Sequence, residues 1–328
     1  MKRREFITLL GSGAVAWPIA AHAQQPTMPV IGYLNATSPE TTNPAYLPAF
    51  RQGLAETGFV EGQNVAVEYR WADNHFDRLP MLAADLARRQ VNVIAATGGP
   101  PAAVAAKAAT TTIPIVFTSG ADPVQAGLVA SLSRPGGNIT GMSLFYTELG
   151  EKRLQLLREL MPKNDLIAFL VNPKFSEGQA QLKDVPAAAR RIAQQLRILN
   201  ASSSNEIEAA FASLRPDMPD GLLVASDPLF YSERGRIVGL ASDHALSAMY
   251  FDRAFVDLGG LMSYGTDAKE MYRQAGIYAA RILKGEKPAD LPVIQPSKFE
   301  LAINLKTAKA QGINVPLQVQ QLADVIIE

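Results

Sequence analysis

The chain has 328 residues, and its 31 Lys and Arg residues balance 31 Asp and Glu residues, which excludes the strong basic field of a nucleic-acid-binding protein. Apolar residues make up 48% of the chain, so wholesale disorder is excluded as well, and the length fits about two domains. Cysteine is absent, which excludes disulfides, thiolate metal sites and a thiol nucleophile.

Residues 1–23 have the pattern of an export signal. They begin with Lys2-Arg3-Arg4, continue as a mildly apolar run and end in Ala21-His22-Ala23, a small-residue cleavage pattern. The adjacent arginines followed by Glu5 and Phe6 resemble a twin-arginine signal. A membrane anchor is the alternative, but the apolar run is short, rich in Gly and Ala, and interrupted by Pro18. We therefore expect cleavage near Ala23 and a mature protein in the periplasm.

Strand and helix patterns alternate through the first half of the remaining chain. A short apolar run predicts a strand over residues 30–34, and apolar residues at helical spacing predict a helix over residues 45–57. The same patterns predict strands at 65–71, 91–96 and 113–117 and helices at 77–90 and 102–109. Asp122-Pro123 is expected to open a further helix. This repetition favours a parallel sheet covered by helices on both faces.

The alternation then restarts in the second half. Helices are predicted at residues 150–160, 187–195, 206–214 and 233–247, and strands at 166–171, 196–199, 221–225 and 249–252. After these come a helix over 271–283, a strand over 299–305 and a short helix over 307–311, which are too few elements for a core of their own.

The predicted fold is therefore α/β, with two Rossmann-like lobes and parallel-rich sheets. We assign residues 28–142 plus about 256–287 to the first lobe, and residues 143–255 plus about 288–328 to the second. This division requires the chain to cross between the lobes more than once. Candidate crossings are residues 141–145, 255–261 and 288–295.

Loops at the carboxyl edge of a parallel sheet are where α/β folds bind ligands. The loop Thr97-Gly98-Gly99-Pro100 places backbone amides at a helix N-terminus, which suits an anion such as a carboxylate. Thr118 and Ser119 would add hydroxyls from the neighbouring strand end. The alternative is that Gly and Pro only form a tight turn that starts a helix.

Two aspartates, Asp122 and Asp227, each precede a proline at an expected helix start. For each aspartate there are two candidate roles: it caps its helix, or it pairs with the ammonium group of a ligand. Asp227 is followed by Phe230 and Tyr231, which would wall a pocket. Further aromatic residues, among them Tyr264, lie near predicted strand ends, where core packing is the alternative role.

The patterns of familiar catalytic sites are missing from the sequence. Of three histidines, His22 belongs to the signal, and His75 and His244 stand alone, so a zinc enzyme is disfavoured. The stretch Gly141-Met142-Ser143-Leu144-Phe145 departs from a nucleophile elbow at its last position. A serine–lysine or carboxylate-pair enzyme stays open. We expect no cofactor.

A long stretch of the chain resembles a known family. It runs from Asp122-Pro123 to Thr140-Gly141 and includes Arg134-Pro135-Gly136-Gly137-Asn138, with weaker marks at Ile31-Gly32-Tyr33-Leu34 and Leu261-Met262-Ser263-Tyr264-Gly265. These residues resemble ABC transporter substrate-binding proteins of the type that includes the tryptophan/tyrosine-binding group. The similarity spans essentially the whole mature chain.

The resemblance implies a leucine-binding-like (type I) periplasmic binding protein, with two lobes, a multi-strand hinge and a ligand clamped between the lobes. It implies that first-lobe loops at Asn35 to Ser38, Thr97 to Pro100 and Thr118 to Asp122 face the cleft. From the second lobe it implies the loops at Ser143 to Phe145, Asn172 to Pro173 and Asp227 to Tyr231. Related amino-acid binders hold the carboxylate with the first lobe and the ammonium with an acid of the second. Here Gly99-Pro100 stands where a hydroxyl residue often helps, so an aromatic or other small carboxylate is the alternative to an amino acid.

We therefore expect a monomeric, non-catalytic protein that captures a small molecule for a permease in the inner membrane. Two alternatives stay open. The same cleft would serve a periplasmic enzyme acting on a small carboxylate, or a ligand-sensing partner of a membrane receptor.

Overall fold

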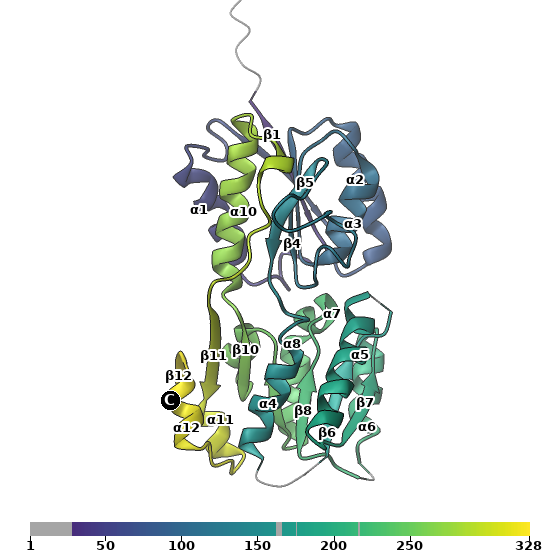
Figure 1. Ribbon diagram of the computed structural model, residues 1–328, viewed down its shortest axis with the longest axis vertical. Coiled ribbons are helices and arrows are strands. Elements are labelled where there is room, and N and C mark those ends of the chain that lie inside the picture. Colours follow the sequence, from purple (N-terminus) through teal and green to yellow (C-terminus); the bar gives the residue numbers. More distant parts are fainter. Residues whose placement is uncertain (1–27, 162–165, 175, 216) are drawn as a thin grey trace, which may run out of the picture.

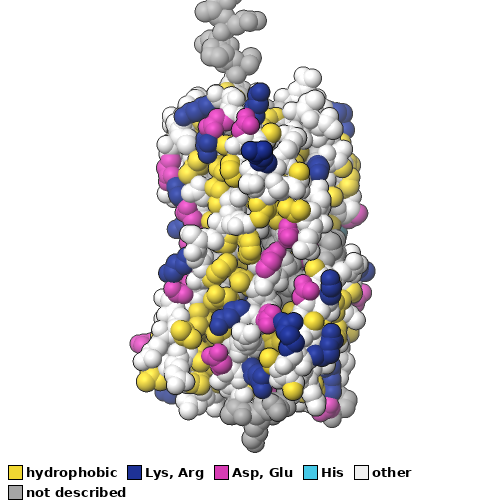
Figure 2. Space-filling view, in the orientation of Figure 1, with side chains coloured by type: hydrophobic (Ala, Val, Ile, Leu, Met, Phe, Trp, Pro, Cys, Tyr) yellow, Lys and Arg dark blue, Asp and Glu magenta, His cyan; other side chains and the backbone are white. Residues whose placement is uncertain are grey.

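Two lobes, each built on its own sheet, make up the protein (Figure 1). The computed structural model describes residues 28–161, 166–174, 176–215 and 217–328. The predicted signal, residues 1–23, lies outside the described residues. Charged side chains of both signs are scattered over both lobes on the face shown in Figure 2.

The first lobe has a five-stranded parallel sheet in the order β2-β1-β3-β4-β5. Its strands are β1 (Val30–Asn35), β2 (Ala66–Trp71), β3 (Val93–Thr97), β4 (Ile115–Ser119) and β5 (Ile139–Ser143). Helices α1 (Tyr46–Glu56) and α10 (Ala268–Leu283) pack on one face of this sheet, and α2 (Leu79–Arg88) and α3 (Pro100–Ala109) pack on the other (Figure 1). A 3-10 turn, η1 (Phe76–Arg78), precedes α2.

The second lobe has a seven-stranded sheet in the order β12-β11-β10-β9-β8-β6-β7. Its described strands are parallel to their neighbours except at the β10–β11 pair, which is antiparallel. The strands are β6 (Ile167–Val171), β7 (Leu196–Asn200), β8 (Gly221–Val224), β9 (Ser247–Tyr250), β10 (Met262–Thr266), β11 (Phe299–Asn304) and β12 (Val325–Ile327). The helices are α4 (Gly150–Leu160), α5 (Ser176–Arg191), α6 (Ser204–Ala212), α7 (Pro228–Ser232), α8 (Arg234–Asp243), α9 (Arg253–Asp257), α11 (Leu305–Ala310) and α12 (Leu317–Leu322).

Three connections cross between the lobes along the described chain: β5 to α4, β10 to α10, and the segment after η2 (Pro288–Asp290) to β11 (Figure 1). Before the third crossing, Ile294 pairs with Met142 beside β5. The first two crossings are joined by a hydrogen bond of 2.5 Å from the Thr266 hydroxyl to the Leu144 carbonyl. The lobes are therefore linked by adjacent segments that form a multi-strand hinge.

The core of the first lobe depends on a close approach of α1 to α10. A Cβ added to Gly276 of α10 would lie 2.0 Å from the Phe50 carbonyl oxygen, and one added to Gly53 of α1 would lie 1.9 Å from the Arg273 carbonyl oxygen. Only glycine permits two helix backbones to pack at this distance. Residues 268–283, which follow the whole of the second lobe's α4 to β10, are thus part of the first lobe's core.

The predicted fold class is confirmed, and three details differ. The helix expected after Asp122-Pro123 is wrong: β4 connects to β5 through turns, with Gly127, Gly136 and Gly137 at positive φ. Strands β5, β10 and β12 were not predicted. Residues 262–266 belong to the second sheet as β10, whereas residues 291 and 294 bond to β5 of the first lobe, so the second and third of the three predicted lobe boundaries fall later in the chain than predicted.

Candidate functional site

A cavity of about 620 Å³, including its mouth, lies between the two lobes. The first lobe contributes the loops after β1, β3 and β4 and residues of α1 and α10. The second lobe contributes the crossing after β5, the corner between β8 and α7, and the loop after β9. The cavity therefore lies at the carboxyl edges of both sheets, where α/β folds place their ligands.

Aromatic rings from both lobes form much of the cavity wall. Tyr46 of α1 stacks on Tyr272 of α10, with ring centroids 4.4 Å apart. On its other side Tyr46 stacks on Tyr231 of the second lobe, at 6.1 Å. Tyr146 and Phe251 of the second lobe complete the wall and meet edge to face at 5.3 Å. Such rings offer flat, apolar surfaces to a planar ligand.

Asp227 carries the most informative charge in the cavity. One carboxylate oxygen accepts hydrogen bonds from the amides of Leu229 (2.8 Å) and Phe230 (3.3 Å), so Asp227 caps α7. Burial, partly offset by these amides, raises the pKa of Asp227 to about 7, and the charge of Glu177 on α5 adds to the rise. A buried carboxyl group in this state favours a cationic partner, which would restore its ordinary acidity.

Asp252 is the second buried carboxyl group of the cavity, and it joins the lobes. Its Oδ2 accepts hydrogen bonds from the Tyr46 hydroxyl of the first lobe (3.0 Å) and the Tyr146 hydroxyl of the second (2.6 Å). Its Oδ1 caps α9 through the Ala254 amide at 2.8 Å. Burial raises the pKa of Asp252 above its usual range. The Tyr46–Asp252 hydrogen bond therefore links the first lobe to the second.

The first lobe faces the cavity with glycine, proline and hydroxyl groups. Gly98 and Gly99 both have positive φ (80° and 111°), and Pro100 and Pro101 form the first turn of α3. The Gly98 amide donates to the Tyr272 hydroxyl at 3.2 Å. The Thr118 hydroxyl is buried and finds no hydrogen-bond partner of normal geometry within the described chain, so it is available to a ligand.

Direct contacts show that the lobes are closed on one another. A Cβ added to Gly99 would lie 2.8 Å from Cγ of Pro228 across the cleft. The Ser232 hydroxyl of α7 bonds to Asn74 Oδ1 of the first lobe at 2.6 Å. Together with the Tyr46–Asp252 bond, these contacts close the cavity at several points.

Five of the thirteen predicted site residues line the cavity: Gly98, Gly99, Thr118, Asp227 and Tyr231. Asn172 lies behind Asp227 and lowers its pKa without itself lining the cavity. The five cavity residues come from three parts of the chain, namely the loop after β3, strand β4 and helix α7 with its cap, so the lobes bring together what the sequence separates.

The remaining predicted residues shape loops or lie elsewhere. Asn35 accepts hydrogen bonds from the Thr37 amide and hydroxyl and donates to the Thr97 hydroxyl, so Asn35 and Thr97 brace the ends of β1 and β3. Ser38 bonds to Thr41. The Ser119 hydroxyl donates to the Ala121 carbonyl.

Asp122, Phe145 and Tyr264 are also outside the cavity. Asp122 caps a turn through the Val124 amide at 2.7 Å, which is the alternative role stated for it. Phe145 has a φ of 58°, and its neighbours Leu144 and Tyr146 line the cavity in its place. Tyr264 lies on β10 and packs against Phe299.

Sequence reasoning missed Tyr46, Tyr146, Tyr272 and Asp252, all of which line the cavity. Tyr46 and Tyr272 lie on helices, where an apolar stripe is indistinguishable from core. Asp252 had one available signal, because it is the last residue of a predicted strand and so lies at a strand end, as Asp227 nearly does.

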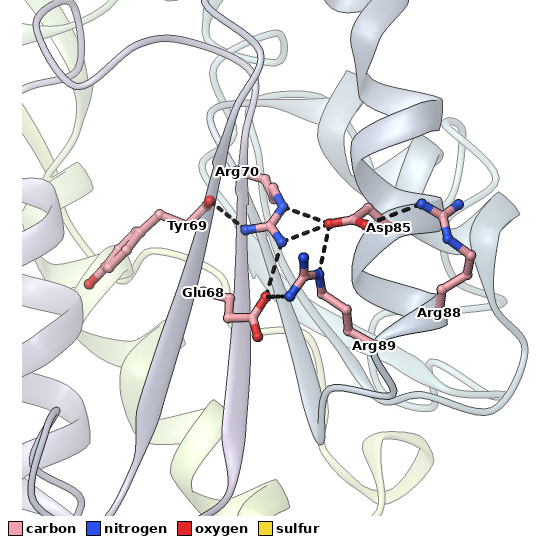
Figure 3. Close-up of polar contacts among 6 residues, drawn as sticks. All are labelled: Glu68, Tyr69, Arg70, Asp85, Arg88 and Arg89. Carbon is pink, nitrogen blue, oxygen red and sulfur yellow. Dashed lines mark hydrogen bonds and ion pairs between the residues drawn. The ribbon is translucent and has the colours of Figure 1, made fainter.

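Outside the cavity, a group of ion pairs lies at the edge of the first lobe (Figure 3). These pairs join Glu68 and Arg70 of β2 to Asp85 of α2 and to Arg89, which caps that helix, and the side chains are partly exposed. Within the described residues, no cluster of His, Asp and Glu has the arrangement of a metal site. None of the described helices is long and apolar enough to span a bilayer.

Comparisons with known proteins agree with this geometry. Residues 45–327 match the family model described as ABC transporter substrate binding protein. A tyrosine-binding protein of Clostridioides difficile is 30% identical over 261 residues, which cover 80% of this chain and 74% of that protein. A Streptococcus pneumoniae ABC domain in complex with L-Trp superposes with a TM-score of 0.82 at 26% identity, over 91% of this chain and 99% of that chain.

A third relative bears on the state of the lobes. A ligand-free, open substrate-binding protein of Clostridium difficile is also 26% identical, over 91% of this chain and 98% of that chain, but its TM-score is 0.64. At equal sequence identity, the structure of this chain is therefore more similar to that of the L-Trp complex than to that of the open protein. This difference agrees with the closed lobes described above.

Proposed function

Because the chain belongs to the ABC transporter substrate-binding protein family, we propose that it is the solute-capturing component of an ABC importer. In this proposal the mature protein works in the periplasm as a monomer. It clamps a small ligand, such as an amino acid with an aromatic side chain, and presents it to a permease in the inner membrane. Residues 1–23 would direct export and be removed.

One observation carries the proposal: stacked aromatic rings from both lobes enclose a cavity beside the buried carboxyl group of Asp227. A planar side chain would stack on these rings, and an ammonium group would pair with Asp227. The tyrosine and L-Trp named for the relatives have both parts.

Capture follows from the way the lobes meet. A ligand that contacts both lobes binds the closed form more tightly than the open form, so binding shifts the population towards closure. The Tyr46–Asp252 bond and the Gly99–Pro228 contact join the two lobes in the closed protein and support this proposal. The permease would then recognise a surface that both lobes form together in the closed protein.

Non-catalytic binding is part of the proposal. The cavity holds carboxyl, hydroxyl and aromatic groups, and a carboxylate-pair enzyme is the second reading. Recovery of a bound compound chemically unchanged supports capture, whereas its turnover by the purified protein contradicts it. A ligand sensor would bind equally well but would show no transport when paired with its permease.

Thermal unfolding with a ligand panel tests the binding class. We expect aromatic amino acids at 100 times their dissociation constant to stabilise the mature protein by about 2.7 kcal/mol, a shift of several degrees in Tm. Aliphatic amino acids and sugars are the controls. Equal shifts for the aromatic and aliphatic sets, or shifts for sugars alone, would contradict an aromatic ligand. N-terminal sequencing of the periplasmic protein tests export and cleavage near Ala23.

A further inference from the structure

The charges of the cavity are all of one sign. Glu177, Asp227 and Asp252 line it from the second lobe, and no Lys, Arg or His is among the described residues that line it. All three carboxyl groups are buried, at 6%, 5% and 4% exposure. Arg234 lies outside the cavity wall, where it stacks on the Tyr231 ring at 4.7 Å and donates to the Tyr231 carbonyl. The cavity lining therefore offers a ligand carboxyl groups and no cationic side chain, and from outside the wall the charge of Arg234 lowers the pKa of Asp252.

The first lobe lacks the amide donors that would compensate for this charge. At the N-terminus of α3, Pro100 and Pro101 have no N–H, and the Ala102 amide bonds to the Gly99 carbonyl at 3.3 Å. The Gly98 amide is engaged by the Tyr272 hydroxyl. Of the amides at this corner, that of Gly99 remains, and the Pro228 ring lies against Gly99. The start of α3 is thus poor in amide donors and covered by an apolar ring, and the buried Thr118 hydroxyl remains as a first-lobe donor in the cavity lining.

These two observations predict opposite effects for the two charged groups of an amino acid: the cavity favours binding of the ammonium group and disfavours binding of the carboxylate. An ammonium group gains from pairing with a buried carboxylate. A carboxylate buried in the same cavity has no cationic partner in the lining, and above pH 7 it is repelled by the ionised Asp227. Such repulsion is how a site discriminates between ligands that share an aromatic body.

We propose that this cleft selects its ligand by an ammonium group on an aromatic body and does not require an α-carboxylate. Aromatic primary amines are then ligands, and they bind at least as tightly as the corresponding amino acids. This inference rests on the proposed function, because it concerns the same cavity and the same capture by closure.

Calorimetric titration at pH 8 with matched compounds tests the inference. The probes are tryptamine, L-tryptophan and indole-3-propionate, which carry the ammonium, both groups, and the carboxylate alone. We expect tryptamine to bind at least as tightly as L-tryptophan, and indole-3-propionate at least 100-fold more weakly than tryptamine. Binding of L-tryptophan with tryptamine 100-fold weaker would overturn this inference and leave the proposed function intact. Binding by none of the three, or by the carboxylate alone, would overturn both.

A gain of preference provides a second, independent test. Pro101→Ala restores an N–H at the α3 corner while keeping a good helix former. We expect it to shift the ratio of L-tryptophan to tryptamine affinity at least fivefold towards the amino acid. Val104→Ala is the matched control, because Val104 lies on the same helix, is 48% exposed and does not line the cavity. An unchanged ratio in Pro101→Ala would contradict the role given to the missing donors.

Discussion

Two helix N-termini, α3 of the first lobe and α7 of the second, face each other across the cleft. They differ in the residue that precedes the first proline of each helix. Both helices begin with a proline, Pro100 or Pro228, at the end of a loop that follows a parallel strand. The residue before that proline is Gly99 in α3, with a φ of 111° and no side-chain cap. In α7 it is Asp227, whose carboxylate caps the helix.

The comparison shows how lobes of the same architecture acquire different chemistry. In α7 the cap is a carboxylate that is also part of the cavity wall, so one residue stabilises the helix and supplies the charge. In α3 the missing side chain allows the second lobe to approach, because Pro228 occupies the space beside Gly99. Both lobes are built on a parallel-rich sheet, but at these two corners the second lobe offers a ligand a carboxyl group and the first lobe offers none.

The largest effect is expected when the charge of the second lobe is removed. Asp227→Asn keeps an oxygen that can cap α7 but loses the negative charge. If an ammonium pairs with Asp227 in the buried site, affinity for an aromatic amine or amino acid should fall by about 2–5 kcal/mol. Calorimetric titration measures this change. Asp122→Asn is the control, because Asp122 also precedes a proline and caps a turn but lies outside the cavity. Equal losses in both variants would exclude Asp227 from ligand binding.

The acidity of the same residue predicts a pH dependence. Burial holds the pKa of Asp227 at about 7, so the carboxyl group is largely protonated below that pH and must release a proton to pair with a cation. Affinity should therefore fall as the pH is lowered below 7, by at most tenfold per pH unit, about 1.4 kcal/mol. The slope should be smaller in Asp227→Asn. Glu177 and Asp252 also line the cavity, and burial raises the pKa of Asp252, so a residual slope from Asp252 is expected in that variant. Affinity that rises as the pH falls would contradict a cationic ligand.

The two lobes should also differ in how a glycine-to-alanine substitution in a helix changes the free energy of unfolding. Gly276→Ala places a methyl group against the Phe50 carbonyl between α1 and α10 of the first lobe, and it should lower the free energy of unfolding by about 1–3 kcal/mol. Gly239→Ala on α8 of the second lobe meets no atom within 4 Å, and it should raise that free energy by about 0.5–1 kcal/mol. Urea unfolding measures both changes. Equal effects of the two substitutions would show that the close approach of α1 to α10 is not required.

The smallest effect concerns the bond that joins the lobes. Tyr46→Phe removes the hydroxyl that donates from the first lobe to Asp252 and should weaken ligand binding about fivefold, or about 1 kcal/mol. Tyr146→Phe removes a hydrogen bond to the same oxygen from within the second lobe. If the Tyr46 bond acts through closure, small-angle scattering of the ligand-free protein should show a larger radius of gyration in Tyr46→Phe only. Equal expansion in both variants would contradict this role.

Much of the fold could be predicted because the buried strands β1, β3, β4, β6 and β8 are short apolar runs that end in polar loops. Prediction failed where local signals were ambiguous. Asp122-Pro123 has the residues of a helix start, yet positive-φ glycines hold the segment that follows in turns. Strand β10, with the sequence Met262-Ser263-Tyr264-Gly265-Thr266, lacks a strong alternating pattern, and its place is fixed by pairing with β9 and β11.

The site was predicted in part for a related reason. Asp227 follows a predicted strand and precedes a helix, so its position at the sheet edge could be inferred from neighbouring residues. Tyr46 and Tyr272 reach the cavity only because α1 and α10, more than 200 residues apart in the chain, pack side by side. Asn35 ends β1 and Ser38 follows that strand, as expected of site residues, but their side chains bond within the first-lobe loops. Position at a strand end therefore predicts the region of the site better than it predicts which side chains enter it.

The return of the chain to the first lobe has a consequence for biosynthesis. The first sheet's α1 face is completed by α10, which a ribosome makes only after most of the second lobe. The second sheet, in turn, is extended by β11 and β12 at the very end of the chain. The first lobe therefore cannot finish folding before α10 is made, nor the second before β11 and β12 are made, and contacts between distant residues make such folding slow. Until those elements are made, a nascent chain of this kind exposes apolar helix and strand surfaces, so its yield should depend on chaperones that hold it until then.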